Sequence, residues 1–286
     1  MTPGEALTAR LGGRWHGTYG EARCPAHDDR SPSLSIRDGD QAPLLKCHAG
    51  CDQRAVLAAI RSAGGAVEKC EPRNNHTATE RHRREAETRE LVSKIWREAR
   101  PIAGTLGESY LRERGITGPL PPTLRFSTLR HSDTGLFLPA IVAAVQGPDR
   151  SLTGLQRTYL RGDGLTKAPV NSPRKMLGSV RCAAVRLAAA ESEMAIGEGI
   201  ETGMSYQRAT GIPTWAALSA SGITNIVLPA LPLAATVHLL VDLDPAGEGA
   251  CAAAAERLSR EGRRVRLCRP VAGNDFNDAL RGAAYA

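Results

Sequence analysis

The chain has 286 residues, of which 42% are hydrophobic and 4% aromatic, so aliphatic side chains must build the core of one or two domains. No apolar run is long enough to span a bilayer, and Met1–Arg10 lacks the basic start and apolar run of a secretory signal. The seven cysteines, an odd number without an export signal, favour free thiols or metal ligands over a disulfide framework. These features predict a cytoplasmic protein without a membrane partner.

The net charge of +7 is unevenly distributed along the chain. Residues 149–190 contain eight Lys/Arg against two Asp/Glu, whereas residues 191–286 contain eight against eleven. A basic segment beside an acidic one is typical of a polyanion track next to a cation site. Scattered, solvated surface charges are the alternative.

Two short-spaced pairs of soft ligands form the first motif in the chain. Cys24 and His27 make one pair, and Cys47 and Cys51 make the second. This spacing fits a closed, structural Cys3His zinc site, whose metal would supply on the order of 10 kcal/mol to the folding of a module with a thin core. Ordinary buried cysteines with a surface histidine are the alternative, and His48 is a competing ligand. The cysteines without a partner at ligand spacing are expected to be core thiols: Cys70, Cys182, Cys251 and Cys268.

The segments around these ligands resemble the zinc-binding domain of primases, in particular the shorter forms encoded by phages, plasmids and integrated elements. They are WHG from Trp15, CPAHDDRSPSLSI from Cys24 and LLKCHAGC from Leu44. In that family the domain is a zinc ribbon that helps to select the template site on single-stranded DNA. The resemblance implies a zinc ribbon over residues 1–70, with Arg30, Ser31 and Ser33 as donors to phosphate.

A composition break follows this segment. Glu71–Glu90 contains no aliphatic residue larger than alanine, which is typical of a linker that runs into a charged helix. One face of that helix is expected to be apolar: Leu91, Val92, Ile95, Trp96 and Ala99. Pro101 ends it, and a short helix over Leu106–Arg114 closes at Gly115. Residues 71–100 are therefore predicted to be a polar linker and helix.

Strand patterns prevail in the second half of the chain. Residues 136–160 alternate around a turn at Gly147–Arg150, which predicts a hairpin. Strands are then expected at Met194–Ile196, Thr214–Leu218, Val237–Leu243 and Arg264–Cys268, with helices at Ile200–Ala209 and Gly247–Glu261. This alternation predicts an α/β fold with a largely parallel sheet covered by helices.

Acidic residues follow the predicted strands of this sheet. Glu198 comes after the first strand, and Asp242 and Asp244 come at the end of a later one, where strand alternation would place both carboxylates on one side. Carboxylates so close repel each other unless a cation lies between them, and hard oxygen ligands favour Mg2+ or Mn2+. Asp275 and Asp278 add carboxylates after the last strand. Helix caps and turns are the alternative for each acid taken alone.

This acidic pattern resembles the Toprim domain shared by bacterial-type primases, topoisomerases and some nucleases. That family carries a Glu after its first strand and an Asp-x-Asp after a later one. The matching catalytic and metal-binding residues are Glu198, Asp242 and Asp244, with Asp275 and Asp278 as a looser match to the last acidic motif. Primases usually place an Asp four residues after the Glu, where this chain has Thr202. Either the preceding Glu201 substitutes or one metal site is weaker.

Leu152–Gly178 resembles the basic half of the primase polymerase core, in which an Arg and a Lys face the metals across a shallow groove. The matching candidates for nucleic-acid or nucleotide binding are Arg157, Lys167, Arg174 and Lys175. A guanidinium can hold phosphate with two hydrogen bonds, and a solvated surface charge is the alternative for each of the four. The sequence YLRERG from Tyr110 is also usual in this family just before the polymerase core.

These features together predict a small N-terminal zinc ribbon followed by a primase-type α/β core that ends in a Toprim, Rossmann-like sheet. Residues 101–190 would form the basic N-terminal part of the polymerase core, and residues 191–286 would form the Toprim domain.

The resemblance implies a DNA primase, which makes short RNA primers on single-stranded DNA from ribonucleoside triphosphates by two-metal nucleotidyl transfer. The expected cofactors are structural Zn2+ and catalytic Mg2+ or Mn2+. The chain has no Walker phosphate-binding loop, so the replicative helicase is expected to be a separate protein. Two alternatives stay open: a Toprim-type metal-dependent nuclease, and a catalytically weak DNA-binding accessory module of replication, which Thr202 favours.

Overall fold

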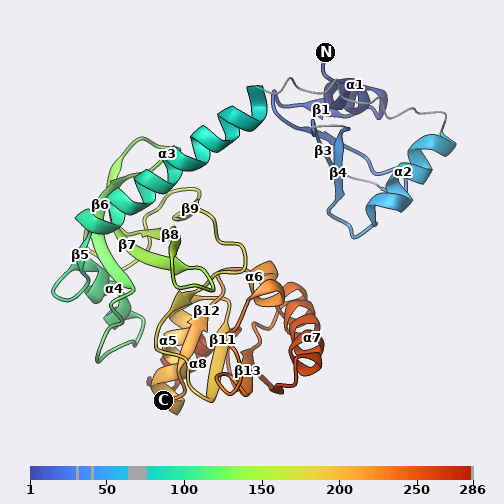
Figure 1. Ribbon diagram of the computed structural model, residues 1–286. Helices are drawn as coiled ribbons and strands as arrows, with labels where there is room; N and C mark the ends of the chain where they lie inside the picture. The colour runs from blue at the N-terminus through green and yellow to red at the C-terminus, as the bar shows by residue number, and fades with distance from the viewer. Residues whose placement is uncertain (30–31, 40–41, 64–75, 285–286) are drawn as a thin grey trace. The chain divides into compact units, whose positions relative to one another are not determined.

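The computed structural model describes residues 1–29, 32–39, 42–63 and 76–284 (Figure 1). Contacts within the chain form two compact units that meet in sequence between Arg83 and Arg84. The expectations for Arg30, Ser31 and Cys70 lie outside the described residues.

The first unit is a small antiparallel sheet with two helices. The sheet has the order β1-β2-β3-β4, with β1 at Arg14–Trp15, β2 at Gly20–Ala22, β3 at Leu34–Arg37 and β4 at Leu44–Cys47. Helix α1 (Pro3–Arg10) begins at a capping box, and α2 (Gln53–Ser62) begins after the N-cap residue Asp52. Leu7 and Ile60 are buried in the core of this unit. A core this small is typical of a module that needs a metal to hold it.

The first part of helix α3 (His76–Glu98) is charged, and its second part packs against the sheet that opens the second unit. Val92 and Ala99 are buried against strands of the neighbouring sheet. The helix ends before Pro101, as predicted, because Arg100–Pro101 already form strand β5. The expectation for Leu91 is wrong: this residue is 45% exposed, because it lies about 100° from Val92 around the helix.

An antiparallel sheet of five strands opens the second unit. Its order is β5-β6-β7-β8-β9, with β6 at Leu124–Arg130, β7 at Phe137–Gln146, β8 at Leu152–Tyr159 and β9 at Arg174–Gly178. Strands β7 and β8 are the predicted hairpin, whereas β6 and β9 carry too many polar residues for the pattern to reveal them. Helix α3 covers the face that carries Val142, which we call the α3 face. The opposite, inner face carries Ile141 and packs against α4 (Leu106–Glu113), the predicted short helix.

A second sheet of five strands completes this unit. Its order is β10-β12-β11-β13-β14, with β10 at Val185–Arg186, β11 at Glu193–Gly197, β12 at Thr214–Ala216, β13 at Thr236–Leu240 and β14 at Arg264–Cys268. All neighbouring strands are parallel except β10 and β12. The predicted, largely parallel sheet is therefore confirmed. Its strand order reverses next to β11, and such a switch marks the ligand crevice of an α/β sheet.

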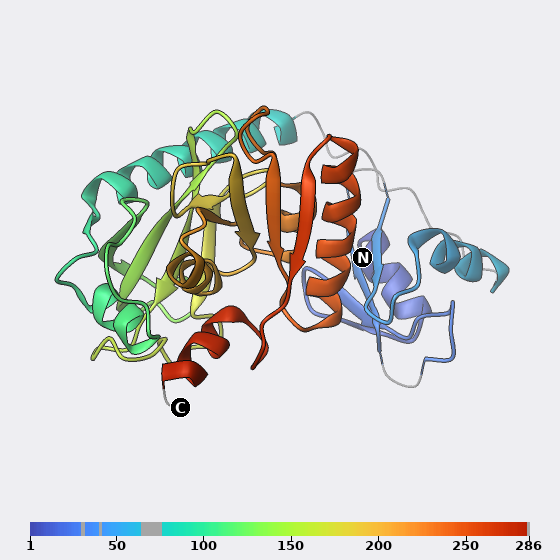
Figure 2. The same ribbon diagram turned by 90° about the horizontal axis from the view of Figure 1, so that it is seen from below.

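Helices cover both faces of this sheet. Helices α5 (Ile200–Thr210) and α8 (Phe276–Ala284) lie on one face, and α6 (Ala220–Asn225) and α7 (Pro245–Arg260) lie on the other (Figure 1). Figure 2 shows α7 running alongside the last two strands, β13 and β14. None of the helices in the described ranges is long and apolar enough to cross a bilayer.

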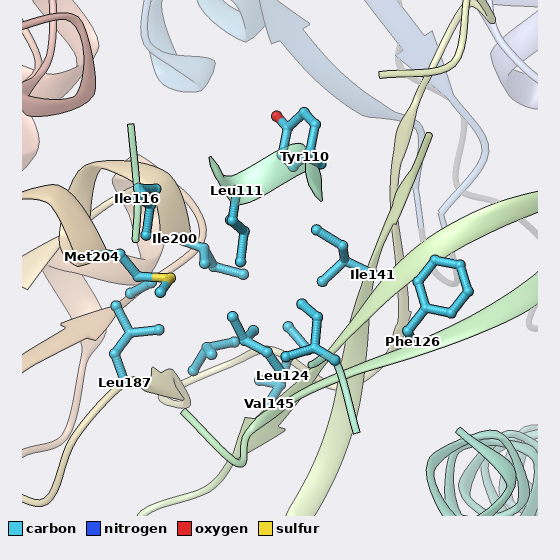
Figure 3. Packing of buried hydrophobic residues seen from close by; sticks show 14 of the residues in the cluster. Tyr110, Leu111, Ile116, Leu124, Phe126, Ile141, Val145, Leu187, Ile200 and Met204 are labelled. Atoms are coloured by element: carbon cyan, nitrogen blue, oxygen red, sulfur yellow. The ribbon is translucent and has the colours of Figure 1, made fainter. Parts of the chain in front are cut away.

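A shared apolar cluster joins the two sheets of the second unit. It contains side chains from α4, β6 and β7 on one side and from α5, β10 and β12 on the other. Figure 3 shows Leu111 of α4 beside Ile200 of α5, with Met204 and Ile141 in the same cluster. The backbone of Ala184, just before β10, also pairs with the end of β7. The inner face of the first sheet is therefore held at a set position against the parallel sheet.

Candidate functional site

The four predicted zinc ligands lie together in the first unit. Cys24 follows β2, His27 lies in the next turn, Cys47 ends β4 and Cys51 precedes α2. One ligand atom from each residue lies within 4.8 Å of all the others, and Nδ1 of His27 is 3.3 Å from Sγ of Cys51. Three sulfur atoms and an imidazole nitrogen in this arrangement can hold one tetrahedral metal ion.

Asp29 braces this Cys/His cluster, a role that the sequence pattern does not reveal. Its Oδ2 accepts hydrogen bonds from the Cys24 backbone N–H and from the Ser33 hydroxyl, both at 2.6 Å. Its Oδ1 lies 3.7 Å from Nε2 of His27. A carboxylate behind a ligating histidine orients the ring and raises its basicity. The Ser33 hydroxyl therefore bonds within the site, whereas the sequence suggested a contact with phosphate.

His48 is the competing ligand that the sequence offers, and its ring bonds outside this cluster. Nε2 of His48 lies 2.8 Å from Oγ of Ser35, so His48 is outside the cluster. Burial acts to raise the pKa of Cys47, but hydrogen bonds from the Cys51 backbone and the Ser33 hydroxyl lower it to about 6. A thiol with such a pKa is readily available as the thiolate that binds metal.

The predicted acids gather at the carboxyl ends of the parallel strands. Glu198 follows β11, Asp242 follows β13, Asp244 is the N-cap residue of α7, and Asp275 directly precedes α8. We call these four residues the acidic cluster. Helices α5, α7 and α8 all begin beside them, and the partial positive charge of a helix N-terminus offsets part of the repulsion between carboxylates.

Asp242 is the member of the acidic cluster on which the others act most strongly. Its pKa is raised to about 6 by burial and then by the negative charges of Glu198, Asp275 and Asp244, against the opposing charge of Arg174. Burial and Asp244 likewise raise the pKa of Glu198. The Oδ1 atom of Asp242 is buried and has no hydrogen-bond partner among the described residues. Because buried carboxylate oxygens are normally paired, this atom could be a ligand for a cation.

The chain brings Asp242 and Asp244 together by a turn. Strand β13 ends at Leu240, before the predicted end, so strand alternation does not reach these residues. The Asp244 N–H donates to the Asp242 carbonyl at 2.8 Å, and Oδ1 of Asp244 accepts from the Gly247 N–H at 2.7 Å. A Cβ on Gly247 would lie 2.6 Å from the Asp242 carbonyl oxygen, so this close approach requires glycine. The helix cap uses one oxygen of Asp244 and leaves the other for a cation.

Asp275 and Asp278 have different environments. Oδ1 of Asp275 accepts from the Asp278 N–H at 2.8 Å, and Asp275 belongs to the acidic cluster because its charge acts on Asp242. Oδ2 of Asp278 accepts from the Asn274 N–H at 3.2 Å. Asp278 therefore orders the turn before α8, and the largest charge effects on Asp242 come from Glu198, Asp275, Asp244 and Arg174.

The predicted basic residues of β8 and β9 lie on opposite faces of their sheet. Arg157 and Lys175 face each other across the two strands on the α3 face, so Arg174 points to the inner face. Arg174 opposes the charge of the acidic cluster. Lys175 instead pairs with Asp133 at 2.6 Å, and Arg157 donates to the Met176 carbonyl at 3.0 Å. The structure thus brings Arg174 to the acids and leaves Arg157 and Lys175 away from them.

Glu201, the possible substitute acid, pairs with other groups. Its Oε1 accepts from the Tyr110 hydroxyl at 2.9 Å and lies 3.5 Å from Nζ of Lys167. Burial opposes ionisation, but the charges of Lys167 and Arg174 outweigh it and hold the pKa of Glu201 below its usual range. Burial and the Glu201 charge raise the pKa of Tyr110, so its hydroxyl stays a donor. Thr202 is 3% exposed. The YLRERG motif contains Tyr110, but the sequence did not predict its hydrogen bond to Glu201.

Cys251 lies in α7 close to the acidic cluster. It is 1% exposed, and its Sγ donates to the Leu240 carbonyl at 3.6 Å. Burial raises the pKa of Cys251 to about 11, and the charges of Asp242 and Glu198 add to the effect. This packing agrees with the expectation of a core thiol.

We expect one tightly bound zinc ion per chain. Cys47→Ser should abolish zinc binding and destabilise the first unit, because the cluster loses one thiolate and its folding depends on the metal. The adjacent variant His48→Ala should keep the zinc. Elemental analysis of the purified proteins checks both. Less than half a zinc per chain in the unaltered protein, or zinc loss in the His48 variant, would contradict the ligand set.

Asp242 should make the stability of the metal-free protein depend on pH. Because its pKa rises from 3.8 to about 6 on folding, the unfolded chain binds fewer protons in this interval, and stability falls as pH rises through it. Asp242→Asn should therefore raise the melting temperature in EDTA at pH 8, by roughly 2–4 °C for each kcal/mol gained, and should change it less at pH 5.

Asp133→Asn is the matched control for this measurement. Hydrogen bonds from Lys175 and Ser132 lower the pKa of Asp133, so its loss should not stabilise the protein at pH 8. Equal effects of the two substitutions, or a larger gain for Asp242→Asn at pH 5 than at pH 8, would disprove repulsion within the acidic cluster.

Two family models match the second unit. Residues 86–187 match the Domain of unknown function (DUF7146), and residues 193–284 match the Toprim domain. No curated protein has significant sequence similarity to this chain.

Solved structures similar to this chain come from primases. The zinc-binding and RNA polymerase domains of the Aquifex aeolicus primase are 13% identical with a TM-score of 0.42, over 99% of this chain and 80% of that one. The primase fragment of the bacteriophage T7 primase-helicase protein is 14% identical with a TM-score of 0.42, over 93% and 97%. A DNA primase domain from Pseudomonas aeruginosa is 16% identical with a TM-score of 0.45, over 69% and 76%.

The match to the Toprim model coincides with the parallel sheet and with the strand ends that carry the acidic cluster. The predicted resemblance of this segment is confirmed: residues 193–284 of the chain are a Toprim domain.

Proposed function

We propose that this chain is a DNA primase, which joins ribonucleotides into short RNA primers on a single-stranded DNA template. The observation that carries the proposal is the buried Oδ1 of Asp242, which has no hydrogen-bond partner in the described part of the chain, among the acids of a Toprim domain and with Arg174 as the opposing charge. Carboxylate oxygens are the hard ligands that Mg2+ and Mn2+ prefer. Glu198, Asp242, Asp244 and Asp275 would hold such ions.

Divalent cations at this place would lower the pKa of an attacking 3′-hydroxyl and neutralise charge on a triphosphate. The acidic cluster by itself repels a nucleotide, so fixed positive charge is needed beside it. Arg174 supplies this charge from the inner face, and its guanidinium can hold a phosphate with two hydrogen bonds. Lys167 would supply a second positive charge. Burial lowers the pKa of Lys167, and Arg174 lies close enough for its charge to lower that pKa further.

The remaining parts of the chain take their roles from this proposal. Residues 1–70 would be a zinc ribbon that contacts the template, and residues 71–100 a linker and helix. Residues 101–190 would be the basic part of the polymerase core, completed by residues 191–286. The Cys/His cluster supports a primase over a Toprim nuclease, because the acidic cluster alone suits either reaction. A replicative helicase would be a separate partner.

Incubation with single-stranded DNA, labelled ribonucleoside triphosphates and Mg2+ distinguishes the possible functions. New short RNA would support the primase, and shortened DNA would instead identify a nuclease. Unchanged DNA without RNA would leave a binding module. The same incubation with Mn2+ separates a preference for the metal from an absence of activity.

The variant Asp242→Asn/Asp244→Asn should lose primer synthesis by a factor of about a thousand or more, because neutral amides are poor ligands for hard cations. Single-stranded DNA binding should stay nearly intact. The fold should survive, since asparagine caps a helix as well as aspartate does. Asp163→Asn, which removes an exposed acid paired with Arg161, is the control and should keep activity. Primer synthesis by the double variant would show that the acidic cluster is not the active site.

The neighbours Arg174 and Lys175 should differ in their effect on DNA binding. If the template follows the inner face, Arg174→Ala should flatten the dependence of log affinity on log salt by about 0.7, the value for one phosphate contact on a single strand. Lys175→Ala should leave the slope unchanged, because Lys175 pairs with Asp133 on the α3 face. Titrations of labelled single-stranded DNA at several salt concentrations measure both slopes. The reverse result would place the template on the α3 face.

A further inference from the structure

Three segments far apart in sequence meet at a buried carboxylate that the proposed reaction does not use directly. Glu201 in the first turn of α5 is 8% exposed, and Tyr110 of α4 is 2% exposed. The Tyr110 hydroxyl lies 2.9 Å from Oε1 of Glu201, and Nζ of Lys167, from the loop between β8 and β9, lies 3.5 Å from the same oxygen. One carboxylate oxygen therefore receives both a neutral donor and a cation.

The carboxylate and the lysine are each held firmly. Tyr110 lies at the edge of the shared apolar cluster, and Figure 3 shows its hydroxyl directed away from the other labelled side chains. The backbone of Lys167 pairs with Leu160 at the end of β8, and the Ala168 N–H donates to the Tyr159 carbonyl at 2.9 Å. Glu201 therefore acts on a lysine whose backbone position is already set, so the ion pair decides where its flexible side chain points.

Stability does not explain a buried ion pair at this place. Removing two charges from water costs several kcal/mol per ion, and apolar residues of the same volume often serve the fold as well or better. The surroundings would suit such residues, because Ile200 and Met204 of the same helix lie in the apolar cluster. The carboxylate would instead serve to orient a cation beside a phosphate site.

Arg174 connects Glu201 to the acidic cluster. Its charge acts on Glu201 and also on Glu198 and Asp242. Once a divalent cation neutralises the acidic cluster, the attraction of Arg174 to Glu198 and Asp242 falls. Glu201 then remains as a carboxylate that pairs with Lys167 and whose charge also attracts Arg174.

We propose that Glu201 is a positioning residue, which keeps Lys167 directed at the phosphates of the incoming nucleoside triphosphate. This inference rests on the proposed function. It also explains why Glu201 does not replace the acid missing at Thr202: its carboxylate is committed to the basic side of the site.

The test is Glu201→Gln in the full chain. The amide oxygen can still accept from Tyr110, so shape and one hydrogen bond persist while the charge is lost. We expect the Kd for ATP with Mg2+ and the KM for nucleotide to rise about tenfold, which corresponds to roughly 1.4 kcal/mol. The kcat should change by less than about threefold, the signature of lost nucleotide binding. The melting temperature should fall, because Lys167 loses its buried partner, so both constants are measured well below it.

Two further variants separate positioning from a structural role. Tyr110→Phe removes the neutral hydrogen bond and keeps the charge, so KM should stay within about twofold of the unaltered protein. In a Lys167→Ala background, Glu201→Gln should weaken nucleotide binding by clearly less than its effect alone, because residues that act through each other are not additive. Full additivity, an unchanged KM in Glu201→Gln, or a lower melting temperature with unchanged Kd would overturn the inference.

The two proposals fail in different ways. Primer synthesis by the unaltered protein with equal nucleotide affinity in Glu201→Gln would disprove the role of Glu201 alone. Nucleotide binding that depends on Glu201 in a protein that makes no RNA would disprove the primase alone. An unaltered protein that does not bind ATP with Mg2+ would overturn both.

Discussion

The site of the second unit depends on the apolar cluster that its two sheets share. Close-packed interiors transmit position with little slack, so the inner face of the antiparallel sheet is held against the strand ends of the Toprim domain. This packing sets Arg174 of β9 against Glu198 and Asp242, which come from separate strands of the other sheet. Charges that interact through protein attract or repel more strongly than they would in water. A small displacement of the cluster would therefore alter the balance between the acids and Arg174.

The parts of this site that could be predicted are those set by local sequence. The spacing of Cys24, His27, Cys47 and Cys51 predicts two ligand pairs on tight turns. The acids that follow the parallel strands lie at one edge of the sheet even when the predicted strand ends are off by a few residues. The parts that could not be predicted depend on contacts distant in sequence or on a strand without a clear pattern. Glu201 meets Tyr110 across 91 positions. The register of β9 decides which face of the sheet each basic residue occupies. This strand could not be predicted because its composition is polar.

Asp244 shows why a helix cap and a cation ligand are not exclusive interpretations. One of its oxygens begins α7 by accepting from Gly247, and the helix start in turn lies against the carbonyl of Asp242. The turn that follows β13 is tight for this reason, and it brings two carboxylates together without the strand alternation that the sequence suggested. Local backbone requirements and the electrostatics of the acidic cluster thus select the same residues. Asp278 also accepts a backbone hydrogen bond, from Asn274 in the turn before α8, and its part in cation binding stays a prediction.

The position of Cys251 has a consequence for the chemistry of oxidation. Thiolates, and not thiols, react with peroxides and alkylating reagents. With a pKa of about 11, this sulfur is thiolate in only about one molecule in ten thousand at neutral pH. Burial and the negative charges of Asp242 and Glu198 therefore keep Cys251 unreactive toward these reagents.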